Sequence, residues 1–312
     1  MRQITKNLLM VRPSNFSSNF ETLSSNAFQC QVESNSSQDS IQITALEEFD
    51  HMVRKLKSVN IEILVFDDIN SFKNPDAIFP NNWVTFHNDG TVVIYPMMSP
   101  KRRKERRIDI IKSLSSLGFT VGDIIDLSHL ENECLYLEGT GSMILDRVSK
   151  KAYACISSRT TSEALSVFSN TMNYQIIQFR STTEIPIYHT NVMMSLGEET
   201  ALVCFDAIEE EEICSKLRMD LKDSGRIVIN VSIDQMNNFL GNALEVRNKK
   251  DEKYLLMSET AKKSLTVEQE RMIEDRLNLL SFPIPTIEKY GGGSVRCMLA
   301  EIFLEKKDQQ DI

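Results

Sequence analysis

Short apolar segments alternate with longer amphipathic segments along almost the whole chain, and this alternation most constrains the fold. Residues 61–66 have the length and composition of a buried strand, whereas apolar residues recur at helical spacing within residues 45–58. Strands that alternate with helices in this way favour an α/β fold. No proline- or glycine-rich linker interrupts the pattern after residue 41, so we predict one domain rather than two.

The same criteria predict further strands and helices, although direct comparison of residues shows no internal repeat. The strands are expected at residues 5–12, 91–96, 143–145, 151–157, 174–179, 202–205 and 226–231. The helices are expected at residues 101–117, 161–172, 209–222 and 266–280, the last opened by a capping-box pattern. Residues 13–41 are too polar to build core. A loop of this length is typical of a lid, a binding loop or a locally disordered segment.

Charge, hydropathy and cysteine spacing exclude several classes of function. The net charge of -9 argues against nucleic-acid binding, and we expect the basic run at residues 101–107 to be the exposed start of a helix. No apolar stretch reaches the ~20 residues of a membrane span, and no signal-peptide pattern opens the chain. The six cysteines form no CxxC pair and no Cys/His cluster. We therefore expect a cytoplasmic protein with reduced thiols and no metal.

Glycine is scarce in this chain, yet three of the 11 glycines stand together at residues 291–293, shortly before Cys297. Consecutive glycines allow the backbone to approach a ligand closely. A cysteine that follows such a turn, beside Arg296, has the features of an exposed and reactive thiolate. The alternative is that Cys297 is a small core residue at the start of the apolar segment 298–303.

A nucleophilic thiol needs a partner that moves protons, and the chain has only four histidines. Three of them lie at polar or turn-like positions: His51, His87 and His129. His189 instead lies between two apolar runs and is followed by Asn191. The end of a strand is where α/β enzymes place reactive groups. The alternative is a hydrogen-bonded structural histidine.

Two further polar clusters are candidates for a binding or catalytic site. Glu138 precedes a tight turn that contains Gly139 and Gly141, although a simple turn with Glu138 facing water explains it equally. Asp76 and Asn82 lie in a segment that also holds the only tryptophan. The alternative there is a polar loop anchored by one aromatic side chain.

Taken in order, these motifs resemble the pentein superfamily, which includes arginine deiminase, dimethylarginine dimethylaminohydrolase and amidinotransferases. The Glu-Gly turn at Glu138, the His-x-Asn at His189 and the Gly-Gly-Gly-x-x-x-Cys at Cys297 carry the resemblance. Residues 10–16 and 79–83 are most similar to the citrulline utilisation hydrolase branch. The resemblance implies a five-bladed α/β propeller of ββαβ units over residues 1–312, with the substrate in a central pore.

The resemblance also implies a role for each candidate residue. Cys297 matches the family nucleophile, His189 the general acid/base and Glu138 the carboxylate that pairs with the reaction centre. Asp76 and Asn82 match positions that contact the planar group of the substrate. Arg159 matches an arginine that holds the substrate α-carboxylate.

Asn82 and Asn191 depart from the family's arginine hydrolases, which commonly present aspartates at these positions. A guanidinium is cationic and only donates hydrogen bonds, so carboxylates suit it. A ureido group is neutral and has a carbonyl acceptor, so an amide side chain complements it better. The two asparagines therefore favour citrulline over arginine, although Glu138 and Asp76 still offer negative charge for a guanidinium.

The resemblance implies a cysteine hydrolase that converts citrulline to ornithine, ammonia and carbon dioxide. It implies no metal and no organic cofactor, a free amino acid as the only partner, and often self-association. Three alternatives stay open: a deiminase or dihydrolase of arginine or a modified arginine, an amidinotransferase, and a non-catalytic binding protein on the same scaffold.

Overall fold

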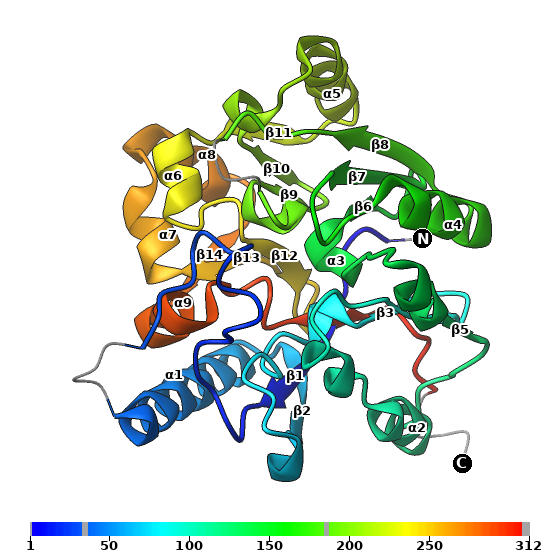
Figure 1. Cartoon of the computed structure of the whole chain (residues 1–312). Helices are drawn as coiled ribbons and strands as arrows, with labels where there is room; N and C mark the ends of the chain where they lie inside the picture. Colours follow the sequence, from blue (N-terminus) through cyan, green and yellow to red (C-terminus); the bar gives the residue numbers. More distant parts are fainter. Residues whose placement is uncertain (1, 33–36, 184–186, 308–312) are drawn as a thin grey trace.

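The computed structural model describes residues 2–32, 37–183 and 187–307, and its strands form five three-stranded sheets. Each sheet combines one antiparallel pair with one parallel pair. Figure 1 shows the five sheets arranged as blades around the middle of the molecule, with the longer helices toward its periphery.

One blade illustrates the repeating ββαβ unit. Strand β6 (Ile144–Asp146) pairs antiparallel with β7 (Lys151–Cys155) through a short turn. Helix α4 (Ser162–Met172) then crosses over, and β8 (Gln175–Phe179) returns parallel to β7. A parallel return requires a crossover of this kind, because a tight turn can join only antiparallel strands.

Local sequence explains where α4 begins and ends. The Thr161 side chain accepts a hydrogen bond from the Ala164 backbone N–H and caps the first turn. Asn173 takes the left-handed conformation, φ 54°, and ends the helix. Leu165 and Phe168 are buried on the face that packs on the sheet. Helical spacing predicted this element to within one residue.

Three other blades repeat the same order. They comprise β3 (Val84–Phe86), β4 (Val92–Ile94), α2 (Ile108–Ser116) and β5 (Ile124–Asp126); β9 (Met194–Leu196), β10 (Thr200–Val203), α5 (Glu211–Asp223) and β11 (Ile227–Asn230); and β12 (Leu244–Arg247), β13 (Lys253–Ser258), α8 (Val267–Glu274) and β14 (Asn278–Phe282). In the third of these, the short helix α7 (Glu259–Ser264) precedes α8.

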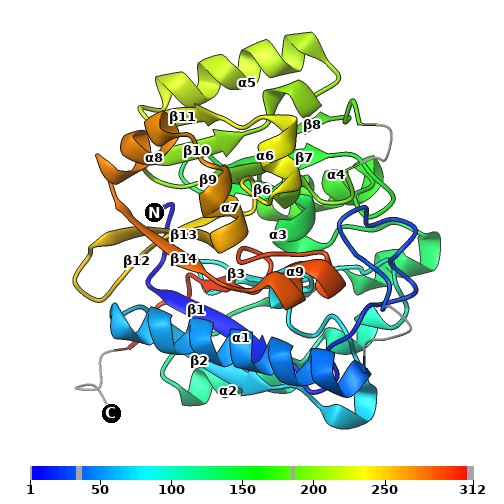
Figure 2. The ribbon, with the colours of Figure 1, turned by 90° about the vertical axis from the view of Figure 1, so that its left-hand side faces the viewer.

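The fifth blade joins the two ends of the chain. Strand β15 (Ala300–Ile302) pairs antiparallel with β1 (Asn7–Arg12), and α1 (Gln38–Ser58) leads to β2 (Glu62–Asp67), which lies parallel to β1. Because its strands come from both ends, this blade brings the C-terminal Gly-Gly-Gly segment next to the N-terminal loop. Figure 2 shows α9 (Pro285–Gly291) close to α1. The predicted pentein fold of ββαβ units is confirmed.

Several predicted elements differ from the observed ones. The helix predicted at 266–280 ends with α8, and its last part is the strand β14. The helix predicted at 101–117 is broken into the 3₁₀ turn Arg102–Glu105 and α2. Helix α1 begins seven residues earlier than predicted, which shortens the expected loop. The predicted strands between residues 61 and 231 all overlap observed strands.

The polar segment after β1 is also more ordered in its packing than predicted. Phe16 is fully buried in a hydrophobic cluster with Phe79 and Tyr290. Asn19, Thr22 and several other polar side chains of the segment are buried as well. Residues 33–36 of the predicted loop lie outside the described residues. The expectation that this segment is too polar for the core is therefore wrong at Phe16.

Candidate active site

Cys297 lies in the turn between α9 and β15, and the preceding glycines allow this turn to pack closely. A Cβ atom added at Gly291 would lie 2.7 Å from the ring of Phe79. A Cβ atom at Gly293 would lie 3.1 Å from the same ring and 3.3 Å from the Cβ of Cys297. Gly292 has a positive φ of 63°. The glycine run is therefore needed where it stands.

The sulfur of Cys297 is buried and receives two amide donors. Asn191 Nδ2 lies 3.4 Å from Sγ, and Asn242 Nδ2 lies 3.3 Å from it. The Cys297 residue is only 3% exposed, so the prediction of an exposed thiol is wrong. The side chain of Arg296, expected to activate the thiol, instead donates hydrogen bonds to the Leu299 carbonyl and to Glu301.

His189 and Glu138 form a buried hydrogen-bonded pair beside this thiol. His189 Nε2 lies 2.8 Å from Glu138 Oε2, and both residues are at most 2% exposed. The Gly-x-Gly turn after Glu138 allows this approach, because a Cβ at Gly141 would lie 2.8 Å from His189 Nδ1. An ionised carboxylate only accepts hydrogen bonds, so Nε2 carries the proton of the neutral ring and Nδ1 is its free base.

Burial and charge set opposite ionisation states for the pair. Burial alone would raise the pKa of Glu138, but the hydrogen bond with His189 and the charges of Arg159 and Arg102 outweigh it, and the pKa falls to about 2. Burial lowers the pKa of His189 to about 4, although Glu138 opposes this. At neutral pH the closed site therefore holds a carboxylate and a neutral imidazole, which is a base able to accept a proton from a thiol.

Arg102 lies at the centre of the charged groups, and the sequence did not predict it as a site residue. Its guanidinium donates two hydrogen bonds of 2.9 Å to Glu105 and lies 3.5 Å from both Asp76 and Glu138. Its Nη2 also donates to Asn82 Oδ1 at 2.9 Å. Arg102 and Glu105 are both 3% exposed. The prediction that the basic run is an exposed surface is wrong at these two positions.

Arg159 enters the site from the opposite side. Its Nη1 lies 3.7 Å from Glu138 Oε2, and its guanidinium lies 4.7 Å from the ring centre of Tyr188. Its Nη2 donates hydrogen bonds to Ser25 Oγ at 2.8 Å and to the Thr22 carbonyl at 3.4 Å. Arg159 thus holds the segment that covers the site.

This segment, residues 13–32, packs onto both sides of the site through a series of hydrogen bonds. Asn19 donates to Asp76, and Asn26 donates to the Gly292 carbonyl at 3.3 Å. The Cys30 N–H donates to the carbonyl of residue 289 in α9 at 2.8 Å. The remaining cavity is only about 10 Å³, room for roughly one water molecule.

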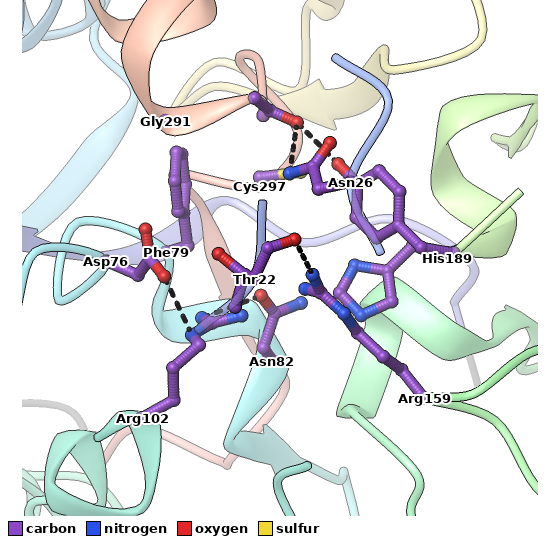
Figure 3. A pocket seen from close by; sticks show the side chains of 13 residues that line it. Thr22, Asn26, Asp76, Phe79, Asn82, Arg102, Arg159, His189, Gly291 and Cys297 are labelled. Atoms are coloured by element: carbon purple, nitrogen blue, oxygen red, sulfur yellow. Dashed lines mark hydrogen bonds and ion pairs between the residues drawn. The ribbon is translucent and has the colours of Figure 1, made fainter. Parts of the chain in front are cut away.

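Figure 3 shows how the side chains converge on this cavity. It is lined by Thr22, Asn26, Asp76, Phe79, Asn82, Arg102, Arg159, Tyr188, His189, Gly291, Gly292, Gly293 and Cys297. Glu138 and Asn191 do not line it but form hydrogen bonds with His189 and Cys297, respectively. The structure therefore brings all seven predicted site residues together, and it adds Arg102 and Asn242.

Four buried polar atoms of this site have no hydrogen-bond partner in the described part of the chain. They are Asp76 Oδ1, Asn82 Nδ2, Arg159 Nε and Asn191 Oδ1. An unpaired buried polar atom costs about 1–3 kcal/mol, so such atoms point to a polar ligand. Two of the four accept hydrogen bonds and two donate, which suits a molecule that has both N–H and carbonyl groups.

Among the described residues, no three His, Cys, Asp or Glu side chains are placed to hold a metal ion. None of the helices described combines the length and the apolar character that a bilayer crossing requires.

Five ββαβ units surround a buried thiol, imidazole and carboxylate. Together with the family match that follows, this architecture defines a member of the pentein superfamily, whose members modify guanidino groups. Within it, the model of the eukaryotic N,N dimethylarginine dimethylhydrolase family matches residues 12–304, and the chain belongs to this family. The description of this family names a hydrolase of dimethylarginine, a guanidino compound. No curated protein is significantly similar to it in sequence.

Solved structures share the fold at low sequence identity. The arginine dihydrolase ArgZ of cyanobacteria superposes with a TM-score of 0.73 at 17% identity; the match covers 98% of this chain but only 42% of ArgZ. The N-terminal domain of ArgZ, bound to substrate, gives a TM-score of 0.72 at 17% identity, covering 95% of this chain and 97% of that domain. DDAH from Pseudomonas aeruginosa, complexed with citrulline, gives 0.65 at 14% identity, covering 96% and 100%.

Proposed function

We propose that the chain hydrolyses a C–N bond in the side chain of a ureido or guanidino amino acid, with citrulline as the preferred substrate. Cys297 serves as the nucleophile, His189 as the general acid/base and Glu138 as the group that stabilises the imidazolium. The observation that carries the proposal is the convergence of the thiol, which has two amide donors, and the His189–Glu138 pair on one cavity.

The proposed reaction has two stages. His189 takes the thiol proton as the sulfur of Cys297 attacks the trigonal carbon, and the new S–C bond gives a tetrahedral adduct. The imidazolium, held by Glu138, then donates its proton to the departing nitrogen as the C–N bond breaks. A water molecule, deprotonated by His189, cleaves the S–C bond of the resulting thiocarbamate and releases a carbamic acid. The carbamic acid breaks its remaining C–N bond and gives carbon dioxide and the second amine. The sum for citrulline and water is ornithine, ammonia and carbon dioxide, with no cofactor and no metal.

The remaining polar groups suit the two ends of such an amino acid. Arg159 is placed to pair with the α-carboxylate once it releases the covering segment, because its guanidinium is a bidentate donor. Asp76 offers a free carboxylate oxygen to N–H groups of the substrate. Phe79 supplies an apolar wall against the aliphatic part of the substrate.

The orientation of Asn82 favours a ureido group. The Arg102 guanidinium only donates, so the Asn82 oxygen must face Arg102, and the NH₂ group is the end of the amide left for a ligand in the cavity that Asn82 lines. A ureido carbonyl accepts a hydrogen bond from this NH₂ group. A guanidinium has no acceptor to offer, so two donors would face each other and leave the amide unpaired.

A second candidate is the dihydrolase reaction on arginine, in which a guanidino group is hydrolysed before the ureido group. The family's activity on methylated arginine and the likeness to an arginine dihydrolase favour this candidate. Glu138 and Asp76 supply negative charge that a guanidinium requires. The amidinotransferase alternative differs from both because it requires an amine acceptor.

We also propose that residues 13–32 act as a lid, because the closed cavity is too small for an amino acid. Opening breaks the contacts of Ser25 with Arg159 and of Asn19 with Asp76, and it frees both charged groups for substrate. Residues 1–312 would then form one catalytic domain. The described cysteines are all free thiols, which supports action in the reducing cytoplasm.

Product analysis tests this proposal. The protein is incubated separately with citrulline, arginine and dimethylarginine, each with and without an added amine, and the amino-acid products are identified. We expect ornithine from citrulline at the highest kcat/KM. Citrulline accumulating from arginine identifies a deiminase, ornithine formed from arginine without free citrulline a dihydrolase, and a requirement for the amine an amidinotransferase. No product from any substrate refutes the proposal.

A further inference from the structure

We infer that Asn242 is the positioning residue that stabilises the Cys297 sulfur as an anion once His189 has taken its proton, an inference that rests on the proposed role of Cys297. Asn242 lies between α6 (Ile233–Asn237) and β12, far from Cys297 in sequence, and it is fully buried. Its Nδ2 lies 3.3 Å from Sγ. No sequence motif and no predicted role points to it.

The hydrogen bonds of Asn242 fix which end of its amide meets the sulfur. Its Oδ1 accepts from the Arg296 backbone N–H at 3.0 Å, and its Nδ2 donates to the Asn191 carbonyl at 2.9 Å. If the amide were rotated by 180°, its oxygen would face the Asn191 carbonyl oxygen, and its NH₂ group would face the Arg296 backbone N–H. The second N–H of Nδ2 therefore points to Sγ as a donor, which favours the anionic sulfur over the protonated one.

Asn242 also ties together the two segments that supply the reactive groups. Its oxygen holds the backbone next to Cys297, and its NH₂ group holds the carbonyl of Asn191, two residues beyond His189. Gly241 makes this docking possible, because a Cβ there would lie 2.3 Å from the Val192 carbonyl oxygen. Glycine at position 241 therefore allows the Asn242 backbone to lie close to the segment that carries Asn191.

The cations of the site do not replace this amide, because their hydrogen bonds are directed elsewhere. Arg296 donates to Leu299 and Glu301, and Arg102 donates to Glu105 and Asn82. The hydrogen bonds to Sγ that the structure describes come from uncharged amides. Of these two, only Asn242 has its orientation fixed by two further bonds.

The test uses the variants Asn242→Asp and Asn242→Ala, with Asn237→Asp as a matched control on the exposed surface of α6. Asp keeps the acceptor for the Arg296 N–H and removes the donor, whereas Ala removes the donor without adding charge. The rate constant for iodoacetamide alkylation of Cys297 is measured across pH without substrate by peptide mass spectrometry, which separates Cys297 from the other thiols. Circular dichroism checks that each variant is folded.

We expect both Asn242 variants to alkylate Cys297 about tenfold more slowly near neutral pH, with the profile moved to higher pH. The kcat should fall by a similar factor, with a smaller change in KM, and Asn237→Asp should match wild type. A wild-type profile in Asn242→Ala overturns the inference, because a shift in Asn242→Asp alone reports added charge rather than a lost donor. If wild type turns over no substrate yet the profile shifts, the proposed function fails and this inference stands.

Discussion

Arg102 Nη2 donates a hydrogen bond to Asn82 Oδ1 at 2.9 Å, and this contact decides what the site presents to a substrate. Because Arg102 cannot accept, the Asn82 oxygen faces Arg102, and the NH₂ group of Asn82 has no hydrogen-bond partner among the described residues. In the proposed function, this amide is the group that distinguishes a neutral, carbonyl-containing side chain from a guanidinium.

Replacing Asn82 by aspartate is predicted to change the substrate preference. The new carboxylate still accepts from Arg102, but it offers a second acceptor instead of a donor to the cavity. We expect the ratio of kcat/KM for citrulline to that for arginine to fall at least about tenfold, as one misplaced hydrogen bond to a charged group predicts. Steady-state kinetics on both amino acids measure this ratio; an unchanged ratio would show that Asn82 does not discriminate.

Arg102→Ala is predicted to destabilise the protein as well as inactivate it. The substitution removes a cation that bridges the buried carboxylates Asp76, Glu105 and Glu138. Removal of one partner from a buried ion pair costs about 3–5 kcal/mol. Urea unfolding measures the loss, and Lys104→Ala, at an exposed position of the same basic run, should lie within about 0.5 kcal/mol of wild type. Equal effects of the two variants contradict the central role of Arg102.

Glu138→Gln tests the carboxylate partner of His189. The amide can fill the same space, but it cannot stabilise an imidazolium by charge. We expect kcat to fall by about a hundredfold or more, because proton transfer by a positioned side chain contributes roughly that factor. Glu133→Gln, which is exposed on the preceding turn, provides the matched control. A Glu138→Gln enzyme with wild-type kcat would exclude Glu138 from the mechanism.

A second buried histidine gives a prediction for stability and pH. Burial, with a contribution from Arg147, lowers the pKa of His87 from 6.5 to about 3. Between these values the unfolded chain binds a proton that the folded protein does not, so this histidine reduces stability as pH falls. Wild type loses this stability at low pH and His87→Gln does not. The difference in the free energy of unfolding between wild type and His87→Gln should therefore shrink by about 2 kcal/mol between about pH 7 and pH 4.5. Urea unfolding at several pH values tests this; a constant deficit contradicts it.

Much of the site was predictable because its residues stand in short motifs with a backbone reason. The glycines before Cys297 and after Glu138 are required by close packing, and rare glycines are visible in a sequence. Arg102 was hidden because a run of basic residues normally faces water, and only tertiary structure places three carboxylates around it. Asn242 has no motif, since its role depends on contacts with segments about 50 residues away.

The alternation of strands and helices was predictable from residue patterns, whereas the five blades were predicted only from the family resemblance. Strands such as β3, β9 and β15 have only three residues, too few for a period of two to stand out. The region of β14 was predicted as the end of a helix because a strong capping box precedes it and leucines crowd its sequence. Pairing with β13 in the sheet decides its conformation instead.

The proposed mechanism requires the sulfur of Cys297 to form a covalent bond to the side-chain carbon of the substrate. It is tested most directly by acid-quenching the enzyme during turnover of citrulline that carries an isotopic label at the ureido carbon, followed by peptide mass mapping. We predict the label on the peptide that contains Cys297, with ornithine and labelled carbon dioxide as products, and neither adduct nor products from Cys297→Ser. Label on another cysteine, or ornithine formed by Cys297→Ser at the wild-type rate, would contradict the claim.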